Sequence, residues 1–197
     1  MAHDDFERDG AGHLLHARLD EPGMLIARLA PGAEIARPDR VVRDAFAPGD
    51  LWFITDDLFQ VDPEGDHWFV DRRRQLIATP FGPVASTRIE DALYEAPGVA
   101  LCMAGSRPDP DDPAHPIPVA AVQLAAPSRD ATALDALSRA AASLPEYARP
   151  RRLRLVAAIA TTDGHRPIKR TLAALDFAPG PDVLTWDPLA QRYQRSP

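Results

Sequence analysis

The sequence has 197 residues, 45% of them hydrophobic, so it can bury an ordinary core in one or two small domains without covalent staples. Its formal net charge of −7 excludes non-specific nucleic-acid binding, because the phosphate backbone would be repelled. The single cysteine, Cys102, excludes an internal disulfide, and its place in an apolar run predicts a buried structural thiol.

The N-terminal segment, residues 1–12, is charged and lacks the apolar run that a secretory signal needs. No uninterrupted apolar stretch approaches the roughly 18 residues of a transmembrane helix. We therefore expect a cytoplasmic protein without a membrane span. His13 and His16 have a helical spacing, but no acidic or thiol ligand joins them in a recognisable pattern, so we expect no metal site.

The first third of the chain has the pattern of an antiparallel β meander. Apolar and aromatic runs predict strands at Met24–Pro31, Asp50–Asp62 and His67–Val70. Between the first two strands, residues 37–50 predict a short helix, with Asp39 as its N-cap and Pro48-Gly49 as its stop.

After Asp71 the composition changes to a basic cluster followed by a Gly-Pro turn, which predicts a domain boundary. The elements expected beyond it are a helix from Thr87, strands at Val99–Gly105 and Ile117–Ala125, a helix at Asp130–Ser143, a solvent-facing edge strand at Arg151–Ile159 and a short helix at Pro167–Leu175. This order predicts an α+β fold, with a small barrel-like β-rich subdomain at 1–71 and, at 72–197, a small sheet covered by helices.

Six collinear pieces of the sequence resemble the C-terminal part of adenylate-forming acyl-CoA synthetases, in the branch of the fatty-acid transport proteins and very-long-chain acyl-CoA synthetases. The pieces are Asp20–Leu29, Val41–Arg72, Gly82–Leu93, Leu144–Leu155, Thr161–Phe177 and Asp182–Gln194. The resemblance implies that residues 1–71 are a remnant of the family's large domain and that 72–197 are its small lid domain. The family's large N-terminal ATP-binding portion has no counterpart in the sequence.

The resemblance also implies a reaction and its cofactors. Family members join a carboxylate to ATP as an acyl-adenylate, and a thiol such as CoA then displaces AMP. ATP or AMP and CoA are therefore implied for this chain by the resemblance only. The sequence contains no Walker-type phosphate loop of its own.

Two residues match family positions near the adenosine ribose. Asp57 matches the carboxylate that accepts hydrogen bonds from the ribose hydroxyls, and Arg72 matches an arginine beside it. Asp56 stands where the family has glycine, which adds a negative charge where a polyanionic nucleotide would approach.

The catalytic lysine of the family lies after a Thr/Gly turn, and its ammonium stabilises negative charge during adenylation. In this sequence Arg166 stands at that position and Lys169 at a second basic position. Both are also explained as exposed charges at the start of a helix. Glu90 matches a family acid with a mainly structural role.

Three functions remain open at this point. In the first, the chain is a degenerate stand-alone ligase-like domain that binds or regulates a partner, because Asp56, Gln75, Pro83 and Arg166 depart from the family pattern. In the second, it is the lid half of a split ligase. In the third, the scaffold has been recruited to an unrelated activity. The first two predict self-association or a protein partner that covers the apolar face of the β-rich part.

Overall fold

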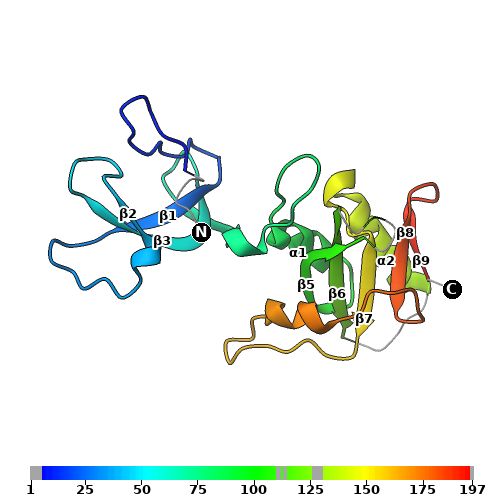
Figure 1. The fold of residues 1–197 in the computed structure, drawn as a ribbon. Coiled ribbons are helices and arrows are strands. Elements are labelled where there is room, and N and C mark those ends of the chain that lie inside the picture. The colour runs from blue at the N-terminus through cyan, green and yellow to red at the C-terminus, as the bar shows by residue number, and fades with distance from the viewer. Residues whose placement is uncertain (1–5, 110–111, 113–114, 126–130, 196–197) are drawn as a thin grey trace. The chain divides into compact units, whose positions relative to one another are not determined.

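The structure, a computed structural model, describes residues 6–109, 112, 115–125 and 131–195. The first residues of the N-terminal segment, 1–5, and the predicted helix start at Asp130 lie outside the described residues. The chain divides into two compact units, Met1–Arg74 (unit 1) and Gln75–Pro197 (unit 2). The fold is α+β, as the sequence predicts (Figure 1).

Unit 1 is built around one long strand, β3 (Leu51–Val61). It pairs antiparallel with β1 (Gly23–Arg28), β2 (Val41–Arg43) and β4 (His67–Arg72), so the three predicted strands are confirmed. Its core is small: Val42 of β2, Ala45 of the turn after it and Leu14 of the N-terminal segment are buried together.

The helix predicted for residues 37–50 is wrong. A single 3-10 turn, η2 (Pro38–Arg40), leads directly into strand β2. The two β-branched residues there, Val41 and Val42, pair with β3 and are buried, because a pleated, half-buried surface suits their side chains better than a helix.

A carboxylate closes the turn after β2. Asp50 accepts hydrogen bonds from the backbone N–H groups of Ala45 (2.6 Å), Phe46 (3.0 Å) and Ala47 (3.0 Å), and from Nε1 of Trp52 (2.9 Å). Burial raises the pKa of Asp50, but these four hydrogen bonds outweigh it and hold the pKa below its ordinary value of 3.8. Pro48-Gly49, predicted as the end of a helix, thus lies in a turn that the Asp50 side chain caps.

Unit 2 contains a five-stranded sheet in the order β5-β6-β7-β8-β9. Its strands are β5 (Val99–Pro108), β6 (Pro116–Leu124), β7 (Arg152–Val156), β8 (Val183–Asp187) and β9 (Arg192–Arg195). Only β6 and β7 are parallel. The strands predicted at 99, 117 and 151 are confirmed.

The predicted edge position of β7 is wrong, because β7 lies between β6 and β8. Its basic residues bind backbone carbonyls: the buried Arg152 donates to the carbonyl of Phe177 (2.7 Å), and the half-buried Arg154 donates to that of Asp176. The strands that extend the sheet beyond it, β8 and β9, were not predicted. They pack through Trp186 and Tyr193, whose rings meet edge to face at 5.0 Å.

Alternate side chains of the sheet supply two cores. Cys102 and Ala104 of β5 belong to the core under α1 (Ser86–Tyr94) and α2 (Ala131–Ala142), whereas Met103 belongs to a second core with Leu172. Both predicted helices are confirmed, and Cys102 is buried as expected. The segment from the predicted third helix forms only a 3-10 helix, η5 (Lys169–Ala174), on the second face (Figure 1). No helix in the described part of the chain is both long and apolar enough to cross a bilayer.

The capped turn of unit 1 predicts a pH-dependent loss of stability. Asp50→Asn should lower the thermal unfolding midpoint of unit 1 near neutral pH, because it removes the charge that four donors share. Since the folded-state pKa is lowered, this stabilisation is present above about pH 4 and is lost as the pH falls through that pKa. Thermal unfolding of both proteins across this range, followed by circular dichroism, measures the effect.

The exposed Asp39, paired with Arg37 on the surface, provides the matched control, and Asp39→Asn should leave the midpoint nearly unchanged. An Asp50→Asn difference that is the same at every pH would contradict the role given to the charge.

Candidate functional site

The loop that carries Arg166 is a closed turn. An isolated bridge joins Thr161 to Pro167, and the N–H of Thr162 donates to the carbonyl of Arg166 at 2.9 Å. His165 adopts a positive φ of 61°, which turns the chain back toward the bridge. Arg166 is exposed, and its guanidinium has no hydrogen-bond or ion-pair partner in the described part of the chain.

Lys169 has a different environment. Its Nζ lies 2.9 Å from Oε2 of Glu90 and 2.7 Å from Oγ of Ser86, and the ion pair is largely buried, with side-chain exposures of 17% and 11%. Glu90 also accepts a hydrogen bond from the backbone N–H of Ala104 through Oε1, at 2.8 Å. Lys169 thus joins η5 to α1 and β5, and of the two predicted cations only Arg166 extends into solvent.

The buried surroundings of Glu90 also explain why the thiol of Cys102 is unreactive. Burial, and secondarily the charge of Glu90, raise the pKa of Cys102 to about 12. Its Sγ donates weakly to the backbone carbonyl of Glu90, at 3.5 Å. A thiol of this kind is protonated at neutral pH and does not act as a nucleophile.

In unit 1 the structure brings the two predicted ribose-site residues together. Asp57 and Arg72 are register partners on β3 and β4, and Nε of Arg72 lies 3.3 Å from Oδ1 of Asp57. Both side chains remain partly exposed, at 35% and 46%. The pair therefore presents a carboxylate and a guanidinium side by side on one strand pair.

The extra carboxylate beside this pair is neutralised internally. Asp56 lies between two arginines: Nη2 of Arg40 is 3.1 Å from its Oδ2, and Nε and Nη2 of Arg73 are each 3.1 Å from its Oδ1. The two arginines thus compensate the negative charge of Asp56. An anionic ligand at Asp57 should therefore be repelled less than the sequence alone suggests.

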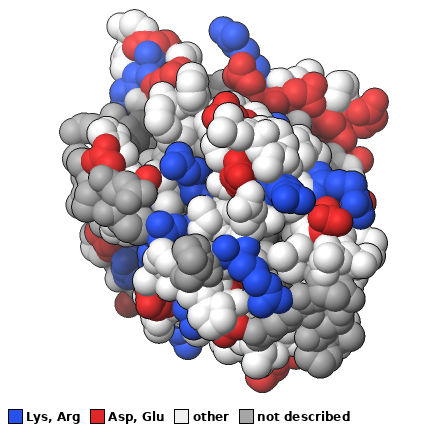
Figure 2. Space-filling model, turned by 90° about the vertical axis from the view of Figure 1, so that its right-hand side faces the viewer, with Lys and Arg blue, Asp and Glu red and all other residues white. Residues whose placement is uncertain are grey.

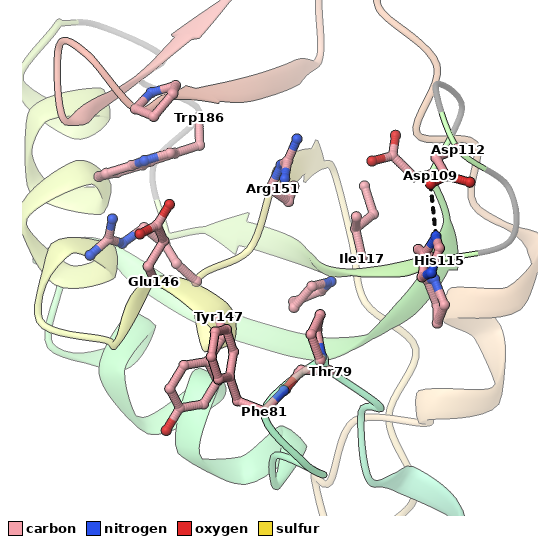
Figure 3. Close-up of a pocket in the computed structure, with 15 residues that line it drawn as sticks. Thr79, Phe81, Asp109, Asp112, His115, Ile117, Glu146, Tyr147, Arg151 and Trp186 are labelled. Carbon is pink, nitrogen blue, oxygen red and sulfur yellow. Dashed lines mark hydrogen bonds and ion pairs between the residues drawn. The ribbon is translucent and has the colours of Figure 1, made fainter.

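Unit 2 contains a pocket that the sequence did not reveal, with a volume of about 750 Å³ (Figure 3). Its walls come from four segments far apart in the chain: the loop before α1, the β5–β6 loop, the segment around η4 (Glu146–Ala148) and the end of β8. Three aromatic side chains line it, those of Phe81, Tyr147 and Trp186, and Phe81 and Tyr147 pack against each other at 5.3 Å.

The charged groups of the pocket differ in how tightly they are held. Arg149 is fixed, because it donates to the carbonyls of Ala141 (3.1 Å) and Leu144 (2.9 Å) and stacks on Trp186, 4.5 Å from its ring centre. Arg151 is exposed, and its side chain has no charged or hydrogen-bonded partner among the described residues.

In Figure 3, Asp109, Asp112 and His115 lie on one side of the pocket and Trp186 with Glu146 on the other, with Arg151 between them. His115 Nδ1 and Asp112 Oδ2 are 2.7 Å apart. The pocket therefore offers aromatic surface with an unpaired guanidinium at its centre. That combination suits a flat, anionic ligand.

On the face of the molecule in Figure 2, basic side chains are scattered among acidic and neutral ones. No extended basic surface is visible on that face. Among the described residues, no three His, Cys, Asp or Glu side chains converge as metal ligands would.

Comparison with known proteins connects these features to a family. No family model matches the sequence. The mouse long-chain fatty acid transport protein 3 is 30% identical over 92% of this chain, and the Saccharomyces cerevisiae very long-chain fatty acid transport protein is 30% identical over 79%. A Mycobacterium tuberculosis medium/long-chain-fatty-acid–CoA ligase is 33% identical over 48% of it.

Solved structures agree with these sequence relatives. The amide bond synthetase McbA from Marinactinospora thermotolerans matches 86% of this chain with a TM-score of 0.64 at 25% identity. The chain belongs to the adenylate-forming acyl-CoA synthetase superfamily. It corresponds to the C-terminal part of these enzymes and covers 28% of the mouse relative, 24% of the yeast relative and 34% of McbA.

A further member of the superfamily shares the fold at lower identity. The o-succinylbenzoate CoA synthetase of Bacillus subtilis, solved with its acyl-adenylate intermediate, matches 87% of this chain with a TM-score of 0.62 at 20% identity. The same enzyme has also been solved with ATP and magnesium and with AMP.

The buried ion pair of this superfamily member predicts a strong pairwise coupling. Lys169→Met should lower the free energy of unfolding of unit 2 by about 2–4 kcal/mol, because it leaves the Glu90 carboxylate buried beside Ser86 without its cation. Glu90→Gln should cost a similar amount. The double variant should lose less than the sum, with a coupling of at least about 1 kcal/mol in urea unfolding.

Arg170, the exposed neighbour of Lys169, gives the matched control, and Arg170→Met should change the stability by less than about 0.5 kcal/mol. Additive losses in the double variant would show that the pair does not contribute as an ion pair.

Proposed function

We propose that this chain is a degenerate acyl-CoA-synthetase-like protein that binds adenylate and thiol ligands but does not form acyl-adenylates by itself. It would act as a binding or regulatory partner in acyl metabolism. The reducing interior of the cytoplasm suits its single, inert thiol, and we place it there.

One observation carries the non-catalytic part of this proposal. Lys169 is the only lysine in the sequence, and its ammonium is held by Glu90 and Ser86 inside unit 2. Arg166 retains a positive charge on the loop, but a guanidinium is a broad, planar donor where adenylation calls for a compact, reorientable ammonium. Pro167 stiffens the chain directly after it.

Ligand binding is supported by separate features in the two units. The partly exposed Asp57–Arg72 pair matches the family's ribose position, and solved relatives of this fold hold ATP, AMP or an acyl-adenylate. In unit 2, the aromatic walls of the pocket and the unpaired Arg151 suit the adenine ring and the phosphates of CoA.

A split ligase is the second candidate function, and two observations favour it. Asp57 and Arg72, which match the family's ribose position, lie side by side and are partly exposed, and Arg166 is exposed on a turn closed by backbone hydrogen bonds. In that case another polypeptide would supply the acyl pocket and the phosphate loop, and this chain would complete the active site in trans.

Calorimetric titration of the purified protein tests the proposal. A non-hydrolysable acyl-adenylate analogue should bind, and Asp57→Asn should weaken its binding at least about tenfold, because a neutral amide is a poorer acceptor for two ribose hydroxyls. CoA should bind as well, and Arg151→Gln should weaken CoA binding by a similar factor without affecting the analogue. The protein alone should form no acyl-CoA from a fatty acid, ATP and CoA.

Two exposed residues provide matched controls: Asp66→Asn for the acidic site and Arg192→Gln for the basic one, neither of which should change either affinity. Acyl-CoA formed by the isolated protein would contradict the proposal. Acyl-CoA formed only after a second polypeptide is added, and lost in Asp57→Asn, would establish the split ligase instead.

The partner role draws on the apolar side chains that unit 1 exposes. Exposed large apolar side chains there include Leu15, Leu19, Leu25, Trp68 and Phe69. Phe69 meets Phe59 edge to face across β3 and β4, at 5.7 Å, so two rings form one surface. We expect a second copy of this chain to cover it, since apolar surface of this kind drives association.

Light scattering over a wide concentration range tests this association. The wild-type mass should rise above that of a monomer, and Phe69→Ser should shift the equilibrium toward monomer, because it removes about half of the paired ring surface. Leu189→Ser, at a 96% exposed site in unit 2, is the control and should have no effect. A wild-type monomer at every concentration, with no co-purifying protein, would rule out this role for the surface.

A further inference from the structure

Asp56 has a backbone conformation that would suit glycine better. Its φ is +72°, in the left-handed region that non-glycine residues occupy only at a cost. Asp and Asn tolerate this region better than most residues, but glycine adopts it freely. An aspartate that persists there needs a compensating role for its side chain.

The side chain of Asp56 has such a role in the structure. Only 15% of it is exposed, although it lies in a unit with a small core. Both of its oxygens are used: Oδ2 contacts Arg40, and Oδ1 contacts two nitrogens of Arg73. The carboxylate therefore connects three elements of unit 1, namely β3, η2 and the segment that follows β4.

The position of Arg73 gives this contact its significance. Arg73 is the first residue of η3 (Arg73–Gln75), the short 3-10 turn in which the chain leaves unit 1, and the division between the units falls directly after Arg74. Besides Asp56, the side chains that contact residues 72–75 include Asp57, which pairs with Arg72, and Asp71, which accepts a hydrogen bond from the N–H of Arg72.

We propose that Asp56 is a latch that fixes the start of the connector between the two units. Its carboxylate holds Arg73, and through it the turn η3, against β3, while Arg40 fixes the carboxylate from the other side. With the latch closed, Arg73 is held against β3. With the latch open, residues 72–76 gain freedom, up to the point where Ile77 is fixed in unit 2 by its backbone hydrogen bonds to Val84.

The latch is electrostatic and only moderately strong, which suits a device that opens. The exposures of Arg40 and Arg73 are 28% and 38%, so water partly screens both ion pairs. Each partly exposed pair shifts a local equilibrium by up to about fivefold. Loss of the carboxylate should therefore raise the opening of the connector by about threefold to tenfold, without unfolding unit 1.

Amide hydrogen exchange, followed by mass spectrometry of peptides across the full-length chain, tests the latch. In Asp56→Asn, which keeps the side-chain shape and tolerates the positive φ, the amides of residues 72–76 should exchange about threefold to tenfold faster. The amides of β3 before Asp56 should keep their wild-type rates. Asp62→Asn, the same change at the β3–β4 turn, is the control and should leave residues 72–76 unchanged.

A second variant covers the case in which Asp56→Asn fails to fold. Arg73→Gln leaves Asp56 with its Arg40 partner and should give the same increase, confined to the connector. Raising the salt concentration from about 0.05 M to about 1 M should also accelerate exchange of the connector more in the wild type than in either variant, because the variants have lost the Asp56–Arg73 ion pair and keep the Asp57–Arg72 pair for salt to screen. Unchanged exchange at residues 72–76 in the folded variants, or an equal increase throughout unit 1, would overturn the proposal.

Discussion

The ion pair between Lys169 and Glu90 is the contact on which the order of unit 2 depends. The segment that connects β7 to β8 has little regular structure: one isolated bridge and one 3-10 helix, η5. Backbone hydrogen bonds within it cannot fix it against the sheet. The ammonium of Lys169 does so by meeting α1 through Glu90 and Ser86, and Glu90 in turn reaches the N–H of Ala104 in β5. Because both charges are largely shielded from water, removal of either partner should strongly destabilise unit 2. Lys169 and Glu90 thus join α1, β5 and the segment between β7 and β8.

Arginines complete the attachment of the same segment from the opposite end. The guanidinium groups of Arg107, Arg152 and Arg154 each donate to a backbone carbonyl between residues 172 and 177. A planar fork of donors can bind such carbonyls directly, and at Phe177 it supplies a hydrogen bond to a buried acceptor. Leu172 and Phe177 can then lie on the second face of the sheet and close its core. The turn that carries Arg166 is therefore followed by a segment that is fixed against the sheet.

The sequence predicts the fold of this protein better than its sites, for a physical reason. Continuous apolar runs identify β5 and β6, because both faces of these strands are buried and the hydrophobicity of each residue reflects its own burial. The helix expected at residues 37–50 fails because pairing of Val41 and Val42 with β3 outweighs local helix signals. The edge position expected for β7 fails because its arginines bind carbonyls that only the folded chain brings near. The partners of Lys169 and Asp56 lie far away in the sequence, and the pocket gathers four separate segments, so no local pattern shows them. Asp57 and Arg72 could be proposed only by resemblance, and their register pairing on β3 and β4 appears first in the structure.

The burial of Lys169 limits the enzymatic modification of this protein at lysine. Lysine side chains are the usual sites of acetylation and ubiquitin attachment, and within these 197 residues there is one such site. Its nitrogen is occupied by Glu90 and Ser86 in the folded state, so a modifying enzyme can reach it only when the joint between α1 and η5 opens. Within these residues, acetylation and ubiquitin attachment at lysine therefore depend on local unfolding. The ion pair with Glu90 that stabilises unit 2 also protects the folded form from both modifications.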